Sequence, residues 1–265
     1  MERNKTKDGN PVLNAAERRK YSFKELSERG HVSVAELSDH LGVSEVTIRK
    51  DLQYLEERNL LLRTHGGAMR LDYLVSEQTL EEKGQRYQEQ KERIGKAAAA
   101  LVEDGDTIIL DAGTTVLQLA RNLRGKRNLT ILTSSITVAN EVMRIPDAEI
   151  IMLGGLVRSS SAAVVGHYAE QIVRDHSFRK LFLAVDGFDV ERGLTTTHTL
   201  EAHLNRIMIE SAMQTIAVFD SSKFGRRGLC SICGVGSVDT IVTDDQIPEN
   251  VRRWLEDKDV SVVIA

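Results

Sequence analysis

From Asp106 onward, the sequence alternates short aliphatic runs with amphipathic segments of helical period. The runs predicted as strands are 107–110, 129–132, 150–153, 181–185, 215–219, 240–242 and 260–264. The segments predicted as helices between them are 116–123, 136–143, 168–173, 200–213 and 251–255. Continuously aliphatic strands that alternate with helices are typical of a mostly parallel sheet covered on both faces. We therefore predict an α/β domain with a Rossmann-like sheet.

Polar residues follow the predicted strands, at the sheet edge where open α/β sheets bind ligands. Asp111-Ala112-Gly113-Thr114-Thr115 opens directly into a helix, so its hydroxyls and free backbone N–H groups would suit a phosphate. A plain turn capped by threonine is the alternative. Hydroxyls, glycines, carboxylates and a lysine follow the other strands, at 133–135, 154–155, 186–189 and 220–225. Together they predict a phosphorylated, polyhydroxylated small molecule as ligand.

Upstream of this domain, the sequence predicts two short amphipathic helices on either side of a glycine. The first covers residues 33–41, with Ser33 as its N-cap and Glu36 at the capping-box position. Gly42 can adopt the positive φ of a tight turn, and the second helix runs from Ser44 to about residue 58. Two short helices joined in this way indicate a helix-turn-helix.

The second of these helices carries the predicted DNA contacts. Its inward positions are predicted to include Val46, Leu52 and Leu55. Polar and charged side chains occupy most of the outer side of its first two turns: Ser44, Glu45, Thr47, Arg49 and Lys50. Such groups near a helix N-terminus can meet base edges and phosphates in a major groove. Taken alone, the same pattern also fits an ordinary surface helix.

A further helix and a hairpin complete this region. The helix is predicted over 14–29, with Tyr21 and Leu26 inward and three cations outward, Arg18, Arg19 and Lys20. Strands at 60–64 and 68–70 flank the turn His65-Gly66-Gly67. Three helices and a hairpin predict a winged helix-turn-helix that binds double-stranded DNA. Three side chains, Arg63, His65 and Arg70, would lie on or near the wing, within reach of phosphates or the minor groove. For His65, a turn-stabilising role fits equally well.

The residues from Ser44 to Leu52, and those from Arg63 to Ala68, resemble the DNA-binding domain of the DeoR family of bacterial transcriptional regulators. The strand-end segments resemble that family's effector domain, whose fold is similar to ribose-5-phosphate isomerase, so the resemblance covers residues 14–265. By this similarity the effector-binding candidates are Asp111, Gly113, Thr114, Thr115, Ser134, Ser135, Gly154, Gly155, Asp186 and Lys223. The sequence departs from the pattern at Ser134 and Ser135, where many relatives have an Asn, and at Lys83, where many have an Arg.

The resemblance implies a repressor of a carbohydrate-catabolism operon whose DNA affinity is modulated by a phosphorylated sugar. Residues 189–206 are most similar to the branch that represses amino-sugar catabolism. The expected organisation is a flexible tail at 1–13, a winged helix-turn-helix at 14–71, a linker at 72–90 and a sugar-phosphate-sensing domain at 91–265. The simplest role for the charged linker is a solvated connector; carrying conformational information between the domains is the other. A helix-turn-helix reads two half-sites, so a dimer is expected, and the family similarity points to a tetramer.

Composition and charge agree with a DNA-binding protein of the cytoplasm. The net charge is −4, but residues 1–71 carry 13 Lys and Arg against 11 Asp and Glu, or +2, which leaves −6 for the remainder. No apolar run reaches the length of a membrane span, and residues 1–10 are too polar for a signal peptide. The only cysteines, Cys230 and Cys233, suit a reducing compartment. Their spacing alone would permit redox or zinc chemistry, but a strand would bury the intervening Ile232, so we expect no metal and no cofactor.

Two other functions fit parts of the sequence. The first is a sugar-phosphate isomerase or deaminase with an appended DNA-binding domain, in which Asp186, Asp189 or Glu201 would act as general base. The loop rich in lysine and glycine of isomerase-like enzymes is absent, and Thr195-Thr196-Thr197-His198 occupies that region. The second, a dinucleotide-dependent redox sensor, is disfavoured because no G-x-G-x-x-G follows the first strand. We therefore predict a regulator rather than an enzyme.

Overall fold

The computed structural model describes residues 13–58, 60–64, 66–71 and 75–265. The chain divides into two compact units, Met1–Leu74 and Val75–Ala265. The first unit has one hydrophobic core, and the second has two, one on each face of its sheet. None of the helices in the described residues is long and apolar enough to cross a membrane.

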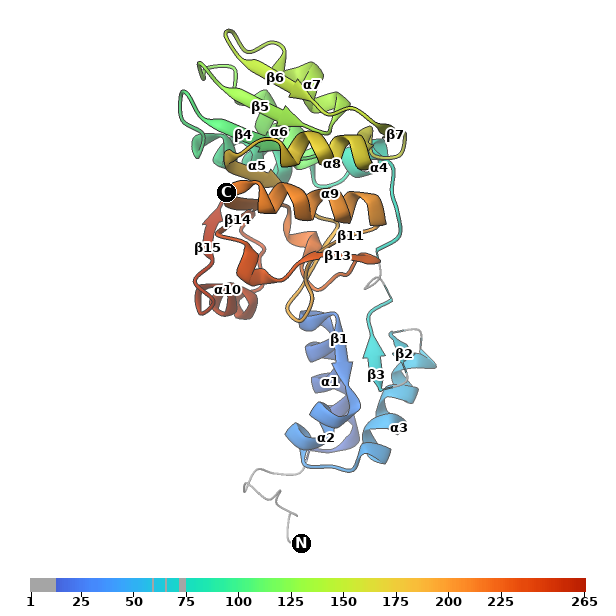
Figure 1. The fold of residues 1–265 in the computed structure, drawn as a ribbon. Coiled ribbons are helices and arrows are strands. Elements are labelled where there is room, and N and C mark those ends of the chain that lie inside the picture. Colours follow the sequence, from blue (N-terminus) through green and yellow to red (C-terminus); the bar gives the residue numbers. More distant parts are fainter. Residues whose placement is uncertain (1–12, 59, 65, 72–74) are drawn as a thin grey trace, which may run out of the picture. The chain divides into compact units, whose positions relative to one another are not determined.

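The first unit contains three helices and a three-stranded antiparallel sheet (Figure 1). Its helices are α1 (Ala15–Arg29), α2 (Val34–Leu41) and α3 (Glu45–Glu56). Its strands are β1 (His31–Ser33), β2 (Leu62–Thr64) and β3 (Gly67–Met69), in the order β1-β3-β2. The predicted hairpin is therefore present as β2 and β3, and β1, which was not predicted, joins its other edge. This arrangement is a winged helix-turn-helix.

Helix boundaries in the first unit follow from capping. Asn14 caps α1, with a capping box to Glu17, and Gly30 ends it in the left-handed conformation at φ 81°. Gly42, at φ 62°, makes the tight turn between α2 and α3, as predicted. The capping box predicted at Ser33 and Glu36 is wrong, because the Ser33 side chain makes no cap hydrogen bond and its backbone pairs with Gly67 as part of β1.

The second unit is built on a seven-stranded parallel sheet, in the order β15-β14-β12-β9-β4-β5-β6 (Figure 1). Its strands are β4 (Thr107–Leu110), β5 (Thr130–Thr133), β6 (Glu149–Met152), β9 (Phe178–Leu183), β12 (Ala212–Val218), β14 (Thr240–Thr243) and β15 (Ser261–Ile264). Its helices are α4 (Leu80–Gly84), α5 (Gln88–Ala100), α6 (Thr114–Arg121), α7 (Ile136–Val142), α8 (His167–Arg174), α9 (Thr199–Glu210) and α10 (Glu249–Glu256). All seven predicted strands and all five predicted helices are present, with small shifts at their ends.

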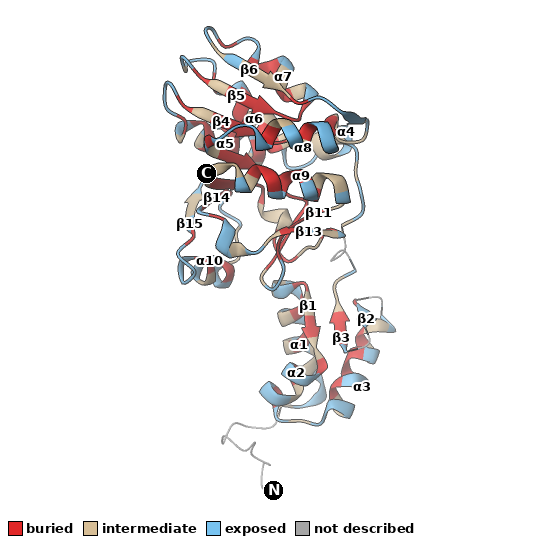
Figure 2. Cartoon of the chain, viewed as in Figure 1, coloured by how far each residue is buried: buried red, intermediate tan, exposed pale blue. Residues whose placement is uncertain are grey.

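Helices cover both faces of this sheet, whose central strands are buried (Figure 2). The side chains of these strands alternate between two hydrophobic cores. On β4, Ile109 belongs to the core with α8, α9 and α10, whereas Ile108 and Leu110 belong to the core with α5, α6 and α7. Burial on both faces explains why these strands are aliphatic throughout.

Smaller elements complete the second unit, and of these only the strand around Ile232 was expected from the sequence. Strands β7 (Leu156–Arg158) and β8 (Ala163–Val165) form an antiparallel pair. A three-stranded sheet has the order β10-β11-β13, from β10 (Gly187–Asp189), β11 (Gly193–Thr196) and β13 (Cys230–Cys233). Single turns of 3-10 helix, η1 (Ser221–Lys223) and η2 (Val235–Ser237), flank β13. Ile232 is buried in β13, as expected, and both cysteines are free.

Candidate nucleic-acid interface and ligand site

The N-terminus of α3 presents the predicted polar residues, but two of them also serve the helix itself. The Ser44 hydroxyl accepts a hydrogen bond from the backbone N–H of Thr47 at 3.3 Å, which makes it the N-cap. The same hydroxyl lies 2.9 Å from the Thr47 hydroxyl. Glu45 and Arg49 are exposed and form an ion pair one helical turn apart, and Lys50 is exposed beside them. Arg49 must therefore leave Glu45 to contact a base, whereas Lys50 has no ion pair within the described residues.

Val46 was predicted to point inward, and this prediction is wrong. The side chain is 58% exposed, and the buried face of α3 is formed by Ile48, Leu52 and Leu55. Position 46 lies two residues before Ile48 and therefore faces away from it, since neighbours on one helix face are three or four residues apart. Val46 thus joins the outer surface of α3, where an apolar side chain can contact a thymine methyl group.

A buried carboxylate fixes α3 against α1. Asp51 is 2% exposed and accepts a hydrogen bond from Nε of Arg18 and one from Nε of Arg19, each at 2.8 Å. The prediction that both arginines face outward is therefore wrong, because their guanidinium groups turn inward to this carboxylate. Two guanidinium groups make cation–π contacts with the Tyr54 ring. The Arg19 guanidinium lies 3.7 Å and the Arg58 guanidinium 3.4 Å from the ring centre.

On the wing, Arg63 is exposed and its backbone N–H donates to a Glu56 carboxylate oxygen at 3.0 Å. Its side chain is available to phosphates. His65, the other predicted contact, lies outside the described residues.

A cavity lies at the carboxyl ends of the central strands of the second unit. The strand order reverses here, because β5 and β6 extend the sheet on one side of β4, whereas β9, β12, β14 and β15 extend it on the other. Such switch points are where open α/β sheets bind ligands. The polar residues that line the cavity are Lys83, Lys91, Asp111, Thr114, Thr115, Ser134, Ser161, Asp186, Thr196, Glu201, Asn205 and Lys223.

Seven of the ten predicted effector residues line this cavity: Asp111, Gly113, Thr114, Thr115, Ser134, Asp186 and Lys223. Gly113 caps α6 and packs closely on the end of β9, since a Cβ at this position would lie 2.6 Å from Cβ of Ala184. The first turn of α6 contains no acidic residue, so no carboxylate of that turn would compete with an anion for its backbone N–H groups and positive dipole end.

The structure does not place the other three predicted residues at the cavity. Ser135 is fully buried and caps α7, where its hydroxyl accepts from the Val138 N–H at 3.3 Å. Gly155 has a φ of 142°, and a Cβ there would lie 2.7 Å from the Val165 carbonyl oxygen, so its role is to let β7 approach β8. Gly154 precedes it in the same connection.

Asp111 is the most perturbed acid in the cavity. Its carboxylate is 4% exposed and accepts from the Ala184 N–H at 3.2 Å and from the Asn205 amide at 3.1 Å. Burial raises the pKa of Asp111 to about 7, and the negative charge of Glu201 acts in the same direction. At neutral pH this carboxyl is therefore about half protonated and can donate to a ligand oxygen as well as accept from one.

Asp186, in contrast, stays ionised. Burial opposes its charge, but the Lys83 ammonium, which donates to its Oδ1 at 2.6 Å, acts together with the Lys223 charge and the Thr196 hydroxyl, and the net effect holds the pKa of Asp186 below its usual value. Its Oδ2 accepts from the Thr196 hydroxyl at 3.0 Å and from the Thr197 N–H and hydroxyl, both at 3.1 Å.

Two further lysines bring positive charge to the cavity. Burial lowers the pKa of Lys91 to about 8, and its ammonium donates to the Lys83 and Arg86 carbonyls. Burial also lowers the pKa of Lys223, although the charges of Asp220 and Asp186 oppose this shift. The Lys223 ammonium makes no hydrogen bond to the described residues, so it can pair with an anionic ligand. No group of three or more His, Cys, Asp or Glu side chains in those residues could hold a metal ion.

Half of the polar lining was not among the predicted effector contacts, although Glu201 was considered as a general base. Lys83 belongs to the segment predicted as a linker, Lys91 to α5, and Glu201 and Asn205 to α9. None of these residues follows a strand, so the strand-end rule could not select them. One feature of the sequence indicated that Lys83 has a role. It stands where many members of the family have an Arg, so this chain and those relatives both carry a cation at that position.

The enzyme alternative finds little support in this geometry. Asp189 is buried outside the cavity and accepts from the backbone N–H groups of Glu191 and Arg192 at 2.9 and 3.0 Å, as a turn carboxylate does. Asp186 is held by Lys83, and Glu201 pairs with Arg158. A base that abstracts a proton from carbon must be free to receive it.

Comparison with known families matches both units. Residues 18–73 match the DeoR-like helix-turn-helix domain, and residues 86–245 match the DeoR C-terminal sensor domain. The chain belongs to the DeoR family of transcriptional regulators. It is therefore a DNA-binding regulator of transcription.

Individual relatives cover nearly the whole chain. The proposed aga operon transcriptional repressor of Escherichia coli O157:H7 is 37% identical over 96% of this chain and 95% of its own length. The GlpR regulator of Haloferax volcanii is 36% identical over 94% of this chain and 97% of its own length. The glycerol-3-phosphate regulon repressor of Escherichia coli K12 is 33% identical, covering 89% and 94%.

Solved structures are more distant. The sorbitol operon regulator SorC of Klebsiella pneumoniae is 13% identical, covers 92% of this chain and 99% of its own, and has a TM-score of 0.39. Ribose 5-phosphate isomerase A of Methanocaldococcus jannaschii is 16% identical, covers 52% and 54%, and has a TM-score of 0.38. At these TM-scores neither similarity bears on function.

Proposed function

We propose that this regulator represses a carbohydrate-catabolism operon and that a phosphorylated sugar, bound in the cavity of the second unit, changes its affinity for operator DNA. The observation that carries the proposal is the pairing of the α6 N-terminus with Lys223 at the sheet switch point. A helix N-terminus suits a phosphate, and so does the Lys223 ammonium, which makes no hydrogen bond to the part of the chain that the structure describes.

The rest of the cavity suits a polyol. Opposite the cations lie groups that accept or exchange hydrogen bonds with hydroxyls: Asp111, Ser134, Ser161, Thr196, Glu201 and Asn205. The relatives support this class of ligand, since one is named for the glycerol-3-phosphate regulon and another for the aga operon. The carboxylates of Asp111 and Glu201 would also accept hydrogen bonds from the amino group of an amino-sugar phosphate. This is the subclass of ligand that the similarity of residues 189–206 indicates.

On the DNA side, the proposed contacts are the outer residues of the α3 N-terminus and Arg63 on the wing. Arg49 is the proposed base-reading side chain and Lys50 the proposed phosphate contact, since a guanidinium can pair bidentately with guanine whereas an ammonium acts as a point charge. A dimer is proposed because the helix-turn-helix reads paired half-sites.

Two experiments test this proposal. Genomic fragments selected by the purified protein supply its DNA target, and fluorescence anisotropy then gives the affinity with and without hexose phosphates, amino-sugar phosphates, glycerol 3-phosphate and their unphosphorylated counterparts. We expect one phosphorylated compound to change DNA affinity and its unphosphorylated counterpart to have little effect. Absence of selective DNA binding at low salt would refute the interface, absence of any effect of the panel would refute the sensor, and turnover of a panel member would restore the enzyme.

A further inference from the structure

The segment of residues 75–91, called the strap here, borders the cavity through Leu80, Lys83 and Lys91, while most of its other residues are exposed. Its first part is fixed by two backbone hydrogen bonds, from the Val75 N–H to the Arg227 carbonyl at 2.8 Å and from the Leu80 N–H to the Ser160 carbonyl at 2.7 Å. Its helix α4 lies beside α6, where a Cβ on Gly84 would be 3.9 Å from Cγ2 of Thr114. The strap also directly continues the chain from the end of the DNA-binding unit at Leu74.

The first side-chain link between strap and cavity is the ion pair of Lys83 with Asp186. Lys83 lies on α4, and its ammonium is the only hydrogen-bond donor to Oδ1 of Asp186 in the described residues. Oδ2 of the same carboxylate is already satisfied by Thr196 and Thr197. One oxygen of Asp186 therefore serves the cavity wall, and the other holds the strap.

The second link passes through Arg158 on β7. Its guanidinium, which is 9% exposed, bridges two carboxylates: Glu77 of the strap and Glu201 of the cavity wall. Serine hydroxyls reinforce both ends, with Ser160 donating to Glu77 and Ser161 donating to Glu201, each at 2.6 Å. Arg158 thus links Glu77 of the strap to Glu201 of the cavity wall.

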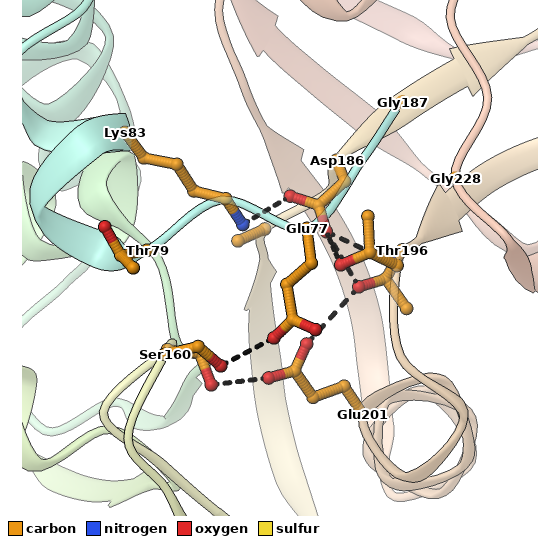
Figure 3. Close-up of polar contacts among 12 residues, drawn as sticks. Glu77, Thr79, Lys83, Ser160, Asp186, Gly187, Thr196, Glu201 and Gly228 are labelled. Carbon is orange, nitrogen blue, oxygen red and sulfur yellow. Dashed lines mark hydrogen bonds and ion pairs between the residues drawn. The ribbon is translucent and has the colours of Figure 1, made fainter. Parts of the chain in front are cut away.

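One hydroxyl connects the two links. Oγ1 of Thr196 lies 3.0 Å from Oδ2 of Asp186 and 3.4 Å from Oε2 of Glu201 (Figure 3). Figure 3 shows Lys83 approaching Asp186 from one side, Thr196 on the other side between Asp186 and Glu201, and Glu77 in contact with Ser160. A ligand that binds one of these carboxylates would therefore also affect the Thr196 hydroxyl, which lies beside both of them.

We propose that the strap is the element through which the cavity acts on DNA binding, and that Lys83 is its ligand contact. In this mechanism an anionic ligand replaces Asp186 as the partner of Lys83, and the freed Oδ1 of Asp186 accepts a ligand hydroxyl. Glu201 turns to the ligand in the same step, so Arg158 loosens from the cavity wall. The inference rests on the proposed function, because it needs a phosphorylated ligand in this cavity.

Charge favours the replacement of Asp186 by a phosphate as the partner of Lys83. Lys83 and Lys223 both face the cavity, and Asp186 is an ionised carboxylate close to both of them. A phosphate carries about two negative charges near neutral pH, so it competes with a single carboxylate for Lys83. A neutral sugar offers no such competition. The strap should therefore respond to the phosphorylated compound and not to its unphosphorylated counterpart.

The test compares ligand binding with ligand response in the full chain. Amide hydrogen exchange is measured over residues 75–91 with and without the panel member that changes DNA affinity. Calorimetry gives the affinity for that compound with and without DNA, and the ratio of the two affinities is the coupling, which for linked sites is typically about 5- to 150-fold. The variants are Lys83→Met and Glu77→Gln, with Lys96→Met, an exposed lysine of α5, as the matched control.

We expect the ligand to change exchange across the strap and Lys96→Met to keep the wild-type coupling. Glu77 does not line the cavity, so Glu77→Gln should bind the ligand with near wild-type affinity but with reduced coupling. Lys83→Met should weaken ligand binding and reduce the coupling further. The inference is overturned if saturating ligand leaves the strap unchanged, or if Glu77→Gln retains the wild-type coupling. If no panel member binds the wild-type protein, the proposed function itself fails, which is a distinct result.

Discussion

Replacing Asp111 with asparagine should make the second unit's stability less sensitive to pH. The pKa of Asp111 is raised from 3.8 to about 7 in the folded protein. Between these values the unfolded chain holds an ionised Asp111 while the folded chain keeps it protonated, so the folded state binds more protons. Stability contributed by the protonated group is therefore present at low pH and is lost as pH rises towards 7.

The magnitude follows from the two pKa values. A pKa difference of one between the folded and unfolded states corresponds to about 1.4 kcal/mol, and between pH 5 and pH 8 the wild-type protein should lose roughly 2–3 kcal/mol through this one group. The asparagine side chain of the variant has no charge to bury, so the variant should gain that amount relative to wild type over the same interval. The sign distinguishes this acid from Asp186, whose lowered pKa contributes stability that is lost as pH falls.

The assay can isolate the second unit. The chain has a single tryptophan, Trp254 in α10, so urea unfolding followed by tryptophan fluorescence reports that unit alone. The free energy of unfolding is measured for wild type and Asp111→Asn at both pH values, with the exposed Asp175→Asn as control. A difference between wild type and Asp111→Asn that does not change from pH 5 to pH 8 would show that Asp111 is not the group that titrates.

Three further predictions concern other parts of the chain. Asp51→Asn should destabilise the first unit by roughly 2–3 kcal/mol, because it leaves two partly buried guanidinium groups without a counter-charge; calorimetry should show an earlier transition for that unit while tryptophan fluorescence is unchanged. Gly95→Ala should destabilise the second unit by about 1–3 kcal/mol, since its Cβ would lie 2.6 Å from the Gln118 backbone, and urea unfolding should show the loss. Arg49→Ala should cost roughly 1–3 kcal/mol of discrimination between operator and mismatched DNA, whereas Lys50→Ala should weaken both alike and reduce the salt dependence of binding.

The sheet of the second unit could be predicted because its strands are buried on both faces. An aliphatic run such as 107–110 that is flanked by helices is best explained as a buried strand of a parallel sheet. The observed strand β4 covers the same residues. Strands β10 and β11 could not be found in this way. Their residues include Gly187, Asp189 and Gly193, and their burial comes from tertiary contacts, including packing of Phe188 on Phe219 and Phe224.

The residues of the candidate site that follow a strand could be predicted from the sequence. Those that lie on other elements were missed. The α6 N-terminus and Asp186 each follow a strand directly. Lys83 reaches the cavity from a short helix in a polar segment, and nothing in that segment's periodicity distinguishes it from neighbouring charges. Arg18 and Arg19 were misplaced for a related reason: their inward direction depends on Asp51 of another helix, which hydropathy does not reveal.

The most direct test of phosphate recognition is calorimetric titration of one phosphorylated sugar and its unphosphorylated counterpart into the wild-type protein and the Lys223→Met variant. Charge-assisted hydrogen bonds to the α6 N-terminus and Lys223 should contribute roughly 1.5–3 kcal/mol, so the wild-type protein should bind the phosphorylated compound about 10- to 100-fold more tightly. Lys223→Met should lose most of that preference and bind the unphosphorylated sugar as before. Equal affinity of the wild-type protein for both compounds, or an unchanged preference in Lys223→Met, would contradict the claim that this cavity recognises a phosphate.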